Sequence, residues 1–320
     1  MSTSLHILTG DSTRRGLEGS GVPGETLVWA DVLYEGPVLS ALGTAEFRRV
    51  RAEYLSGAGY GQLDDILDNM RRIDDRLARL DEYDEVVWWF EHDLFDQLLL
   101  VSHLARLSTD RAAFRRARLI SVDRHLGMMS PSELAALYPS RQPLAEAQVA
   151  LGVEVWQAFC AATPNALDAL ADRGPSPDLP YLAGALSRLL EEYPARTNGL
   201  SRSETQLLRA VAEGYGRLSD AFRAAQTMEG RVFMGDASFW RIARLLAEAK
   251  EPLLTLEADD GPHLPPGALP DAIATLTPLG WAVLQGHADH VAINGVDRWI
   301  GGVHLQGHGP LWRHGGTPVI

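Results

Sequence analysis

Three consecutive ionisable residues, Glu91, His92 and Asp93, follow directly on the apolar run VVWWF at 86–90. The run indicates a buried segment. A buried charge must be paired, hydrogen-bonded, protonated or metal-bound, because an isolated charge is costly in a low dielectric. A histidine beside carboxylates can donate or accept a proton near neutral pH. We therefore predict that His92 is the catalytic acid or base and that Glu91 or Asp93 orients it. The structural alternative is that Arg124 merely neutralises these carboxylates.

Polar residues also follow the other apolar runs of the amino-terminal part. Asp11 and Ser12 follow one run, Asp31 follows a second, and Asp123 with Arg124 follows a third. In a parallel sheet the carboxyl ends of the strands meet at one rim, where α/β proteins bind ligands. We predict that these five residues bind a small anionic ligand, a nucleotide or phosphoester. Asp11 and Ser12 would hold it at a helix N-terminus, and Arg124 would counter its charge. The alternative for Asp11 or Ser12 is a helix cap.

Familiar catalytic motifs are missing from these segments. The turn GDST at 10–13 lacks the Gly-x-Ser-x-Gly elbow, the dinucleotide glycine spacing and the P-loop lysine. Histidine and carboxylates at several strand ends could supply N and O ligands to a metal, but no HExxH or CxxC spacing supports one. No metal ligand and no cofactor is therefore assigned. The leading hypothesis is a hydrolase or transferase acting on a phosphorylated small molecule. The rival is a non-enzymatic regulator that senses a ligand and contacts DNA or a protein partner. In a third hypothesis the charges only pair with one another in a scaffold.

An α/β domain is predicted over residues 1–130 to position these residues. Its apolar runs are continuous rather than alternating, which is typical of strands covered on both faces of a sheet. Helical patterns separate the runs, and this order favours βαβ units and a mainly parallel, Rossmann-like sheet. The predicted strands are 5–10, 26–33, 85–90 and 117–123, and the predicted helices are 44–55 and 62–80.

A helical connector is predicted over 131–196. Ser130 and Glu133 have the spacing of a capping box, and Pro131 takes the first helical position. The Ala/Leu-rich pattern beyond this point predicts further helices at 143–162, 164–172 and 181–193.

A winged-helix-like domain is predicted over 197–290, and a tail at 291–320 is predicted to pack back on the body. The expected elements are helices at 200–214, 217–226 and 236–249, strands at 252–256 and 274–286, and a strand, glycine-rich turn and strand at 295–316. The third helix offers Arg241 and Arg244, but residues 197–290 carry eight Arg plus Lys against twelve Asp plus Glu. DNA-reading domains are usually basic. We therefore favour a protein-contact or packing role for this region and expect no nucleic-acid partner.

The composition sets further bounds. The 320 residues suffice for about two domains, and the formal net charge is −13, with Lys250 as the only lysine. Cys160 is the only cysteine, which rules out an intrachain disulfide and fits a reducing cytoplasm. No run approaches the roughly 20 apolar residues of a membrane span, and no signal-peptide pattern opens the chain. We expect a cytoplasmic protein, with a protein partner or self-association possible.

Seven motifs carry a resemblance to a known family: GDST, WADVLYEGP, WWFEHDLFDQ, VDRH, RTNGLSRSE, FMGDASFW and NGVDRWIGGVHL. Together they resemble the bacterial domain-of-unknown-function 1835 family. The resemblance covers nearly the whole chain, and the amino-terminal third carries the named domain. It implies a Rossmann-like amino-terminal domain, but the family supplies no activity and no catalytic residues to carry over.

Overall fold

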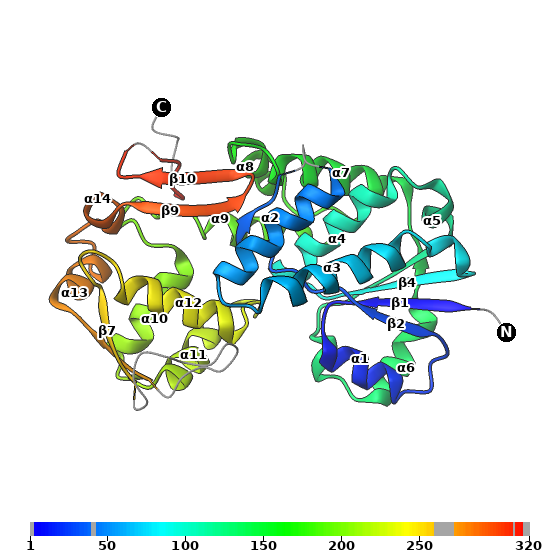
Figure 1. Cartoon of the computed structure of the whole chain (residues 1–320), viewed down its shortest axis with the longest axis horizontal. Helices are drawn as coiled ribbons and strands as arrows, with labels where there is room; N and C mark the ends of the chain where they lie inside the picture. Colours follow the sequence, from blue (N-terminus) through cyan, green and yellow to red (C-terminus); the bar gives the residue numbers. More distant parts are fainter. Residues whose placement is uncertain (1–2, 40–42, 259–271, 310, 316–320) are drawn as a thin grey trace. The chain divides into compact units, whose positions relative to one another are not determined.

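The computed structural model describes residues 3–39, 43–258, 272–309 and 311–315 (Figure 1). Contacts divide the chain into two compact units. The first comprises residues 1–35 and 67–187, and the second comprises residues 36–66 and 188–320. The units cut across the ranges predicted from the sequence, because residues 36–66 belong with the carboxyl-terminal part. The predicted domain ranges therefore stay predictions.

The first unit is built on a five-stranded, mostly parallel sheet, which confirms the mixed α/β class. Its strands are β1 (Ser4–Leu8), β2 (Glu25–Val28), β4 (Glu85–Phe90), β5 (Ala117–Ser121) and β6 (Gln142–Pro143). The strand order is β2-β1-β4-β5-β6, and only β6 runs antiparallel to its neighbour. All four strands expected from the apolar runs are present, although the first, second and fourth end earlier than predicted. From β1 the chain first adds β2 on one side and then β4 on the other, so the strand order switches direction between β1 and β4.

Helices and short turns surround this sheet. They are α1 (Asp11–Glu18), most of α3 (Leu63–Leu77), α4 (Leu94–Leu107), α5 (Arg111–Arg116), the 3-10 turn η2 (Leu126–Met128), α6 (Pro131–Leu137), α7 (Glu146–Phe159), α8 (Asn165–Asp172) and the first part of α9 (Leu182–Leu190). The capping box predicted before α6 is confirmed, since Ser130 and Glu133 bond each other's backbone amides and Pro131 opens the helix. The helices predicted between 143 and 193 are confirmed as α7, α8 and α9.

The position of β4 in the middle of the sheet explains why its sequence is continuously apolar. Strand side chains alternate between the two faces, and both faces are covered here. Val87 and Trp89 pack in one core with residues of α1, η2 and α6. On the other face, the ring of His103 in α4 lies 4.2 Å from the ring of Trp88 and 5.8 Å from that of Phe90. Burying each such large side chain contributes about 1.5–3 kcal/mol.

The second unit contains the carboxyl-terminal helices and two small sheets. Its elements include α2 (Thr44–Gly57), α10 (Arg202–Ala212), α11 (Leu218–Thr227), α12 (Asp236–Ala247), β7 (Leu254–Ala258), β8 (Ala272–Leu276) and α13 (Pro278–Leu284). β7 and β8 pair antiparallel. The strand predicted over 274–286 is wrong beyond Leu276. Thr277 caps α13 by accepting a hydrogen bond from the Gly280 amide, and Pro278 opens the helix.

The carboxyl-terminal segment forms the predicted strand, turn and strand. β9 (Val296–Gly301) and β10 (Val303–Gly307) follow α14 (His290–Asn294) and pair antiparallel. β3 (Gly36–Pro37) pairs with β9 within the same unit, with Gly36 opposite Ile300. The backbone of Gly36 has a φ of +76°, and a Cβ there would lie 2.4 Å from the Tyr54 ring. Only glycine fits both conditions.

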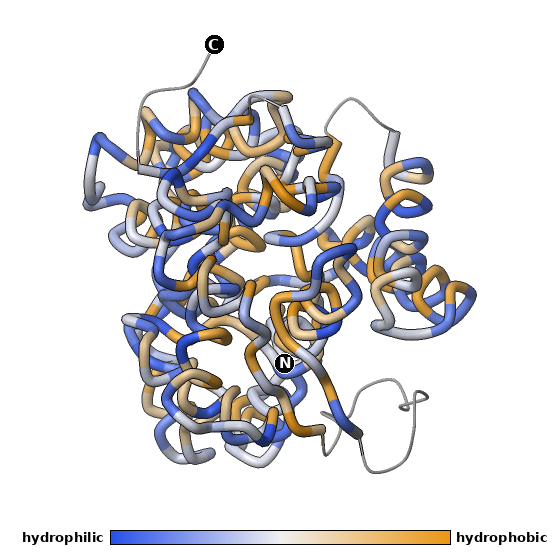
Figure 2. The backbone as a smooth tube through the Cα atoms, turned by 90° about the vertical axis from the view of Figure 1, so that its left-hand side faces the viewer, coloured by the Kyte–Doolittle hydropathy of each residue, from blue (hydrophilic) through white to orange (hydrophobic). Residues whose placement is uncertain are grey.

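Hydropathy along the backbone is mixed in nearly every element. Figure 2 shows apolar and polar residues alternating along the helices rather than gathered into one long apolar segment. In the described parts of the chain, no helix has the length and apolar character needed to cross a membrane.

Candidate functional site

The carboxyl ends of β1, β4 and β5 meet at one rim of the first unit's sheet. Phe90 lies opposite Ser121 in the parallel register, and the Val122 amide donates to the Phe90 carbonyl at 3.1 Å. The loops that leave β4 and β5 therefore start side by side. As a result, ionisable residues about 30 positions apart in the sequence come together. We call Glu91, Asp93, Asp96 and His125 the rim cluster.

Glu91 is the residue that joins the two loops. His125 Nδ1 lies 2.7 Å from Glu91 Oε2, and the Leu126 amide donates to Glu91 Oε1 at 2.8 Å. The Glu91 side chain is 11% exposed and the His125 side chain 37% exposed. A nearly buried carboxylate is thus held by two fixed donors, while the histidine keeps one side toward solvent.

The two aspartates of the rim cluster are fixed by backbone groups. Asp93 is the N-cap of α4, where its Oδ1 accepts from the Asp96 amide at 3.1 Å. The Asp96 Oδ1 accepts from the Glu91 amide at 2.7 Å and from the Thr9 hydroxyl at 3.2 Å. Thr9 follows β1, so Asp96 ties the end of β1 to the end of β4. This is the switch point of the strand order, where open α/β sheets bind ligands.

Burial governs the electrostatics of the rim cluster. Burial raises the pKa of Asp93 to about 7. Burial, and then repulsion from Asp93 and Glu91, raises the pKa of Asp96 well above its usual range. The positive charge that acts on Asp93 is that of His125, whose Nδ1 lies 3.8 Å from Asp93 Oδ2. Glu91 and Asp93 therefore share one histidine, and with Asp96 the cluster has an excess of potential negative charge.

Three residues of the cluster could hold a metal ion. Glu91, Asp93 and His125 each offer one ligand atom, and these atoms lie within 4.8 Å of one another. Carboxylate oxygens and imidazole nitrogen together suit divalent cations such as Zn²⁺ and Mn²⁺. The sequence assigned no metal ligand, because these residues belong to two loops and show no short motif spacing.

The structure brings Glu91 and Asp93, two of the predicted catalytic residues, into one cluster. The third, His92, is buried beside it, with its ring centroid 5.2 Å from that of His125 and 6.1 Å from that of Tyr181. His125 and Asp96 were not among the predicted site residues. Their signals were present in the sequence, since His125 lies two residues after the fourth predicted strand and Asp96 lies three residues after Asp93.

The predicted ligand-binding residues are more scattered. Asp11, Ser12, Asp123 and Arg124 are exposed, and Asp31 is buried after the end of β2. Asp11 is paired with Arg14 at 2.9 Å. Ser12 lies beside the η2 turn, because a Cβ built on Gly127 would be 3.2 Å from the Ser12 Cβ.

Two structural alternatives that the sequence left open for these residues are wrong. Neither Asp11 nor Ser12 caps α1, because the N-cap is Gly10 and the helix has no side-chain cap. No ion pair in the described part of the chain joins Arg124 to Glu91 or Asp93, since His125 takes that place. Instead, hydrogen bonds with Ser130 lower the pKa of Glu133, and the charge of Arg124 lowers it further.

Neither a protein-family model nor a curated protein matches the chain. The resemblance to the domain-of-unknown-function 1835 family therefore stays a prediction.

Proposed function

We propose that the carboxyl rim of the first unit binds a small anionic ligand, a nucleotide or phosphoester. We further propose that it hydrolyses or transfers the phosphoryl group with a divalent cation held by Glu91, Asp93 and His125. The observation that carries the proposal is the convergence of these three ligand atoms within 4.8 Å at the carboxyl ends of parallel strands.

Electrostatics explains why a cation belongs in the proposal. The rim cluster contains three buried carboxyl groups, which would repel one another strongly if all were ionised. A bare phosphate would add to that repulsion. A divalent cation offsets it, and binding of the cation displaces the protons that raised carboxyl pKa values retain near neutral pH. This role replaces the one predicted for Arg124, which is exposed and acts on Glu133.

The chain's own residues have distinct tasks in this proposal. Asp96 fixes the backbone of Glu91, and the Leu126 amide fixes one carboxylate oxygen of Glu91. Asp93 is held at the start of α4. His92, beside His125, gives or takes the proton of the attacking or leaving group. The cation would polarise the phosphoryl oxygen and lower the pKa of bound water.

The first turn of α1 supplies the second wall of the proposed site. The amides at a helix N-terminus carry partial positive charge and bind phosphate oxygens. Ser12 lies in that turn and beside the η2 turn that follows His125. A Cβ added to Gly10 would meet nothing within 4 Å, so the space in front of this turn is open. Asp31 and Asp123 are kept as predicted ligand contacts.

We also propose that the first unit is Rossmann-like and that the protein is cytoplasmic. The strand order β2-β1-β4-β5 with parallel pairing supports the first statement. The single cysteine supports the second.

Metal removal and replacement test the proposed function. The protein is stripped with a chelator and then titrated with Mn²⁺, Mg²⁺ and Zn²⁺ by calorimetry, followed by a panel of nucleotides and phosphoesters. We expect tight binding of one cation per chain and cation-dependent release of phosphate. Glu91→Gln and His125→Ala should lose both, whereas Glu154→Gln, an exposed carboxylate paired with Arg173, should keep both. Cation binding that survives in Glu91→Gln and His125→Ala would overturn the proposal.

A second candidate is the ligand-sensing regulator with a winged-helix region. The second unit has the required order of three helices and a two-stranded sheet, α10, α11, α12, β7 and β8. In a winged helix α12 would be the helix that reads DNA, but here it is covered within its own unit. The Tyr60 hydroxyl lies 2.6 Å from Ser238 Oγ, and Arg241 lies over the Tyr54 ring. This contact favours a packing or protein-contact role over DNA reading. Salt-dependent DNA binding that disappears in Arg241→Ala plus Arg244→Ala would favour the DNA reading instead.

A further inference from the structure

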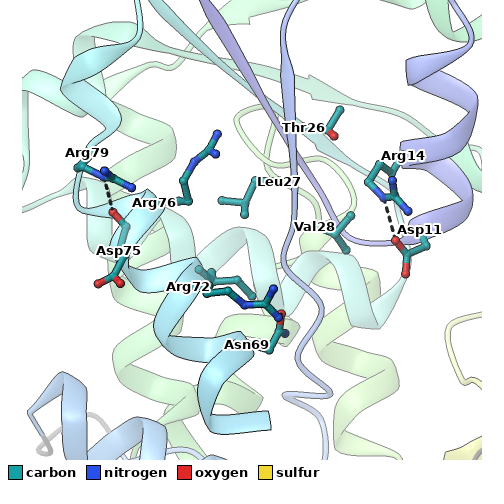
Figure 3. Close-up of a pocket in the computed structure, with 11 residues that line it drawn as sticks. Asp11, Arg14, Thr26, Leu27, Val28, Asn69, Arg72, Asp75, Arg76 and Arg79 are labelled. Atoms are coloured by element: carbon teal, nitrogen blue, oxygen red, sulfur yellow. Dashed lines mark hydrogen bonds and ion pairs between the residues drawn. The ribbon is translucent and has the colours of Figure 1, made fainter. Parts of the chain in front are cut away.

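A groove of about 500 Å³ lies over the outer edge of β2 in the first unit (Figure 3). Residues of α1, of β2 and of α3 with the turn that follows it line the groove. β2 pairs with β1 on one side only and is the edge strand of the sheet. An edge strand presents backbone N–H and C=O groups that can pair with another strand. The groove therefore exposes a surface with unused backbone hydrogen-bonding capacity.

The charge of the groove is opposite to that of the chain. Four arginines and two aspartates line it, whereas the whole chain has a net charge of −13. Arg14 pairs with both Asp11 and Glu18, and Arg76 pairs with Glu25. The other two arginines have none in the described part of the chain.

These two arginines make only neutral contacts. Arg72 donates to the Asn69 side-chain oxygen at 3.3 Å, and Arg79 donates to the Asp75 carbonyl at 3.2 Å. Both are exposed. A guanidinium presents five donors and binds a carboxylate through two of them, so each retains capacity for an anionic partner.

The arginines lie on both sides of β2. Figure 3 shows Arg72, Arg76 and Arg79 on the side of α3, which is also the side of Leu27, and Arg14 on the side of α1. Side chains of a strand alternate between the two faces of its sheet. A strand added beside β2 would direct its own side chains alternately toward the two arginine groups. Acidic side chains directed toward α3 would meet Arg72 and Arg79, whereas Arg14 on the α1 side is already paired with Asp11 and Glu18.

We propose that the open edge of β2 binds an extended acidic segment of a partner protein as an added strand. Backbone hydrogen bonds to β2 supply sequence-independent affinity, and carboxylates against Arg72 and Arg79 supply specificity. A second copy of β2 does not fit, because it would bring the same arginines against these and like charges on paired strands repel. The proposal is independent of the rim cluster and of the cation proposed there.

Fluorescence anisotropy with the full chain tests this interface. The probe is a labelled eight-residue peptide of alternating Glu and Val. Two control peptides have the same length, one with Lys in place of Glu and one with N-methylated backbone amides at alternate positions. We expect the Glu peptide to bind with an affinity that falls as salt rises. The Lys peptide and the N-methylated peptide should each bind at least about tenfold more weakly, since each lacks one of the two interactions.

Variants on α3 assign the binding to the groove. Arg72→Glu plus Arg79→Glu should raise Kd about tenfold or more, because two attractive charges become repulsive. Arg71→Glu is the matched control, because Arg71 lies on the same helix, is exposed, pairs with Asp68 and does not line the groove. It should bind as the wild type does, and circular dichroism should show both variants folded. Equal binding of the N-methylated peptide, or full displacement by equimolar inorganic phosphate, would show a plain anion site and overturn the strand-addition proposal. Absence of binding at peptide concentrations up to millimolar would also overturn the proposal.

Discussion

Cation-dependent stabilisation is the most direct consequence of the rim cluster. A ligand that binds only the folded state stabilises it by RT ln(1 + [L]/Kd), which is about 2.7 kcal/mol at 100 times Kd. For a unit of this size, about 1 kcal/mol raises Tm by about 2–4 °C. A saturating divalent cation should therefore raise the Tm of the chelator-treated protein by about 5–10 °C, measured by differential scanning calorimetry.

Asp93→Asn is the most informative variant for this assay. Asparagine is as good an N-cap as aspartate, so the hydrogen bond from the Asp96 amide and the start of α4 are retained. The variant also removes a charge from a side chain that is only 4% exposed, so the cation-free protein should be no less stable than wild type. If loss of this ligand weakens binding 100-fold, the same cation concentration equals Kd. The stabilisation then falls to about 0.4 kcal/mol, or about 1–2 °C.

The control for this experiment is Glu154→Gln, whose exposed carboxylate pairs with Arg173 and is not a member of the rim cluster. It should show the full cation shift. The reasoning is refuted if wild type shows no shift with Mn²⁺, Mg²⁺ or Zn²⁺ at millimolar concentration. It is equally refuted if Asp93→Asn keeps the whole shift, because the cation would then bind elsewhere.

Three further outcomes are expected. His92→Ala should lower kcat for phosphate release by about 10²–10⁴-fold while the cation shift in Tm is unchanged, and a parallel loss of both would contradict a role in proton transfer. Burial lowers the pKa of His103 well below 6.5. Below pH 6.5 the unfolded chain therefore binds more protons than the folded chain does. The free energy of unfolding should fall as pH drops from 6.5 to 5. His103→Leu should flatten this slope by up to about 1.4 kcal/mol per pH unit in urea titrations, and an unchanged slope would assign it to other groups. Arg188→Met leaves the buried Glu192 and Glu229 without their shared partner, and should cost about 3–5 kcal/mol in the same titrations; a cost below 1 kcal/mol would refute that account.

The sequence predicted individual elements well where the local signal was strong. The run EVVWWF matches β4 residue for residue. A continuous apolar run of this length is buried best as a strand in the middle of a sheet that is covered on both faces. Ser130 with Glu133 caps α6 as the spacing indicated. These signals act over a few residues, and the chain order alone is enough to read them.

The structure differs from the expected elements in two places, one decided by a local helix start and one by a pairing between distant segments. The strand expected beyond Leu276 is a helix, because Thr277 and Pro278 form a helix start that outweighs the apolar run after it. Residues 36–66 join the second unit through the pairing of β3 with β9, a contact between segments more than 250 positions apart. No local pattern announces such a pairing, since two residues of β3 carry it.

The sequence alone determined the residue types at the rim, which are histidines and carboxylates that follow buried strands. From these types alone we expect acid–base or ligand chemistry there. The choice of partners belongs to the tertiary structure. Parallel register sets the ends of β4 and β5 side by side, and this placed His125 against Glu91 and left Arg124 in solvent. Proximity in space depends on strand order, which hydrogen bonds between distant segments establish and which one-dimensional spacing does not encode.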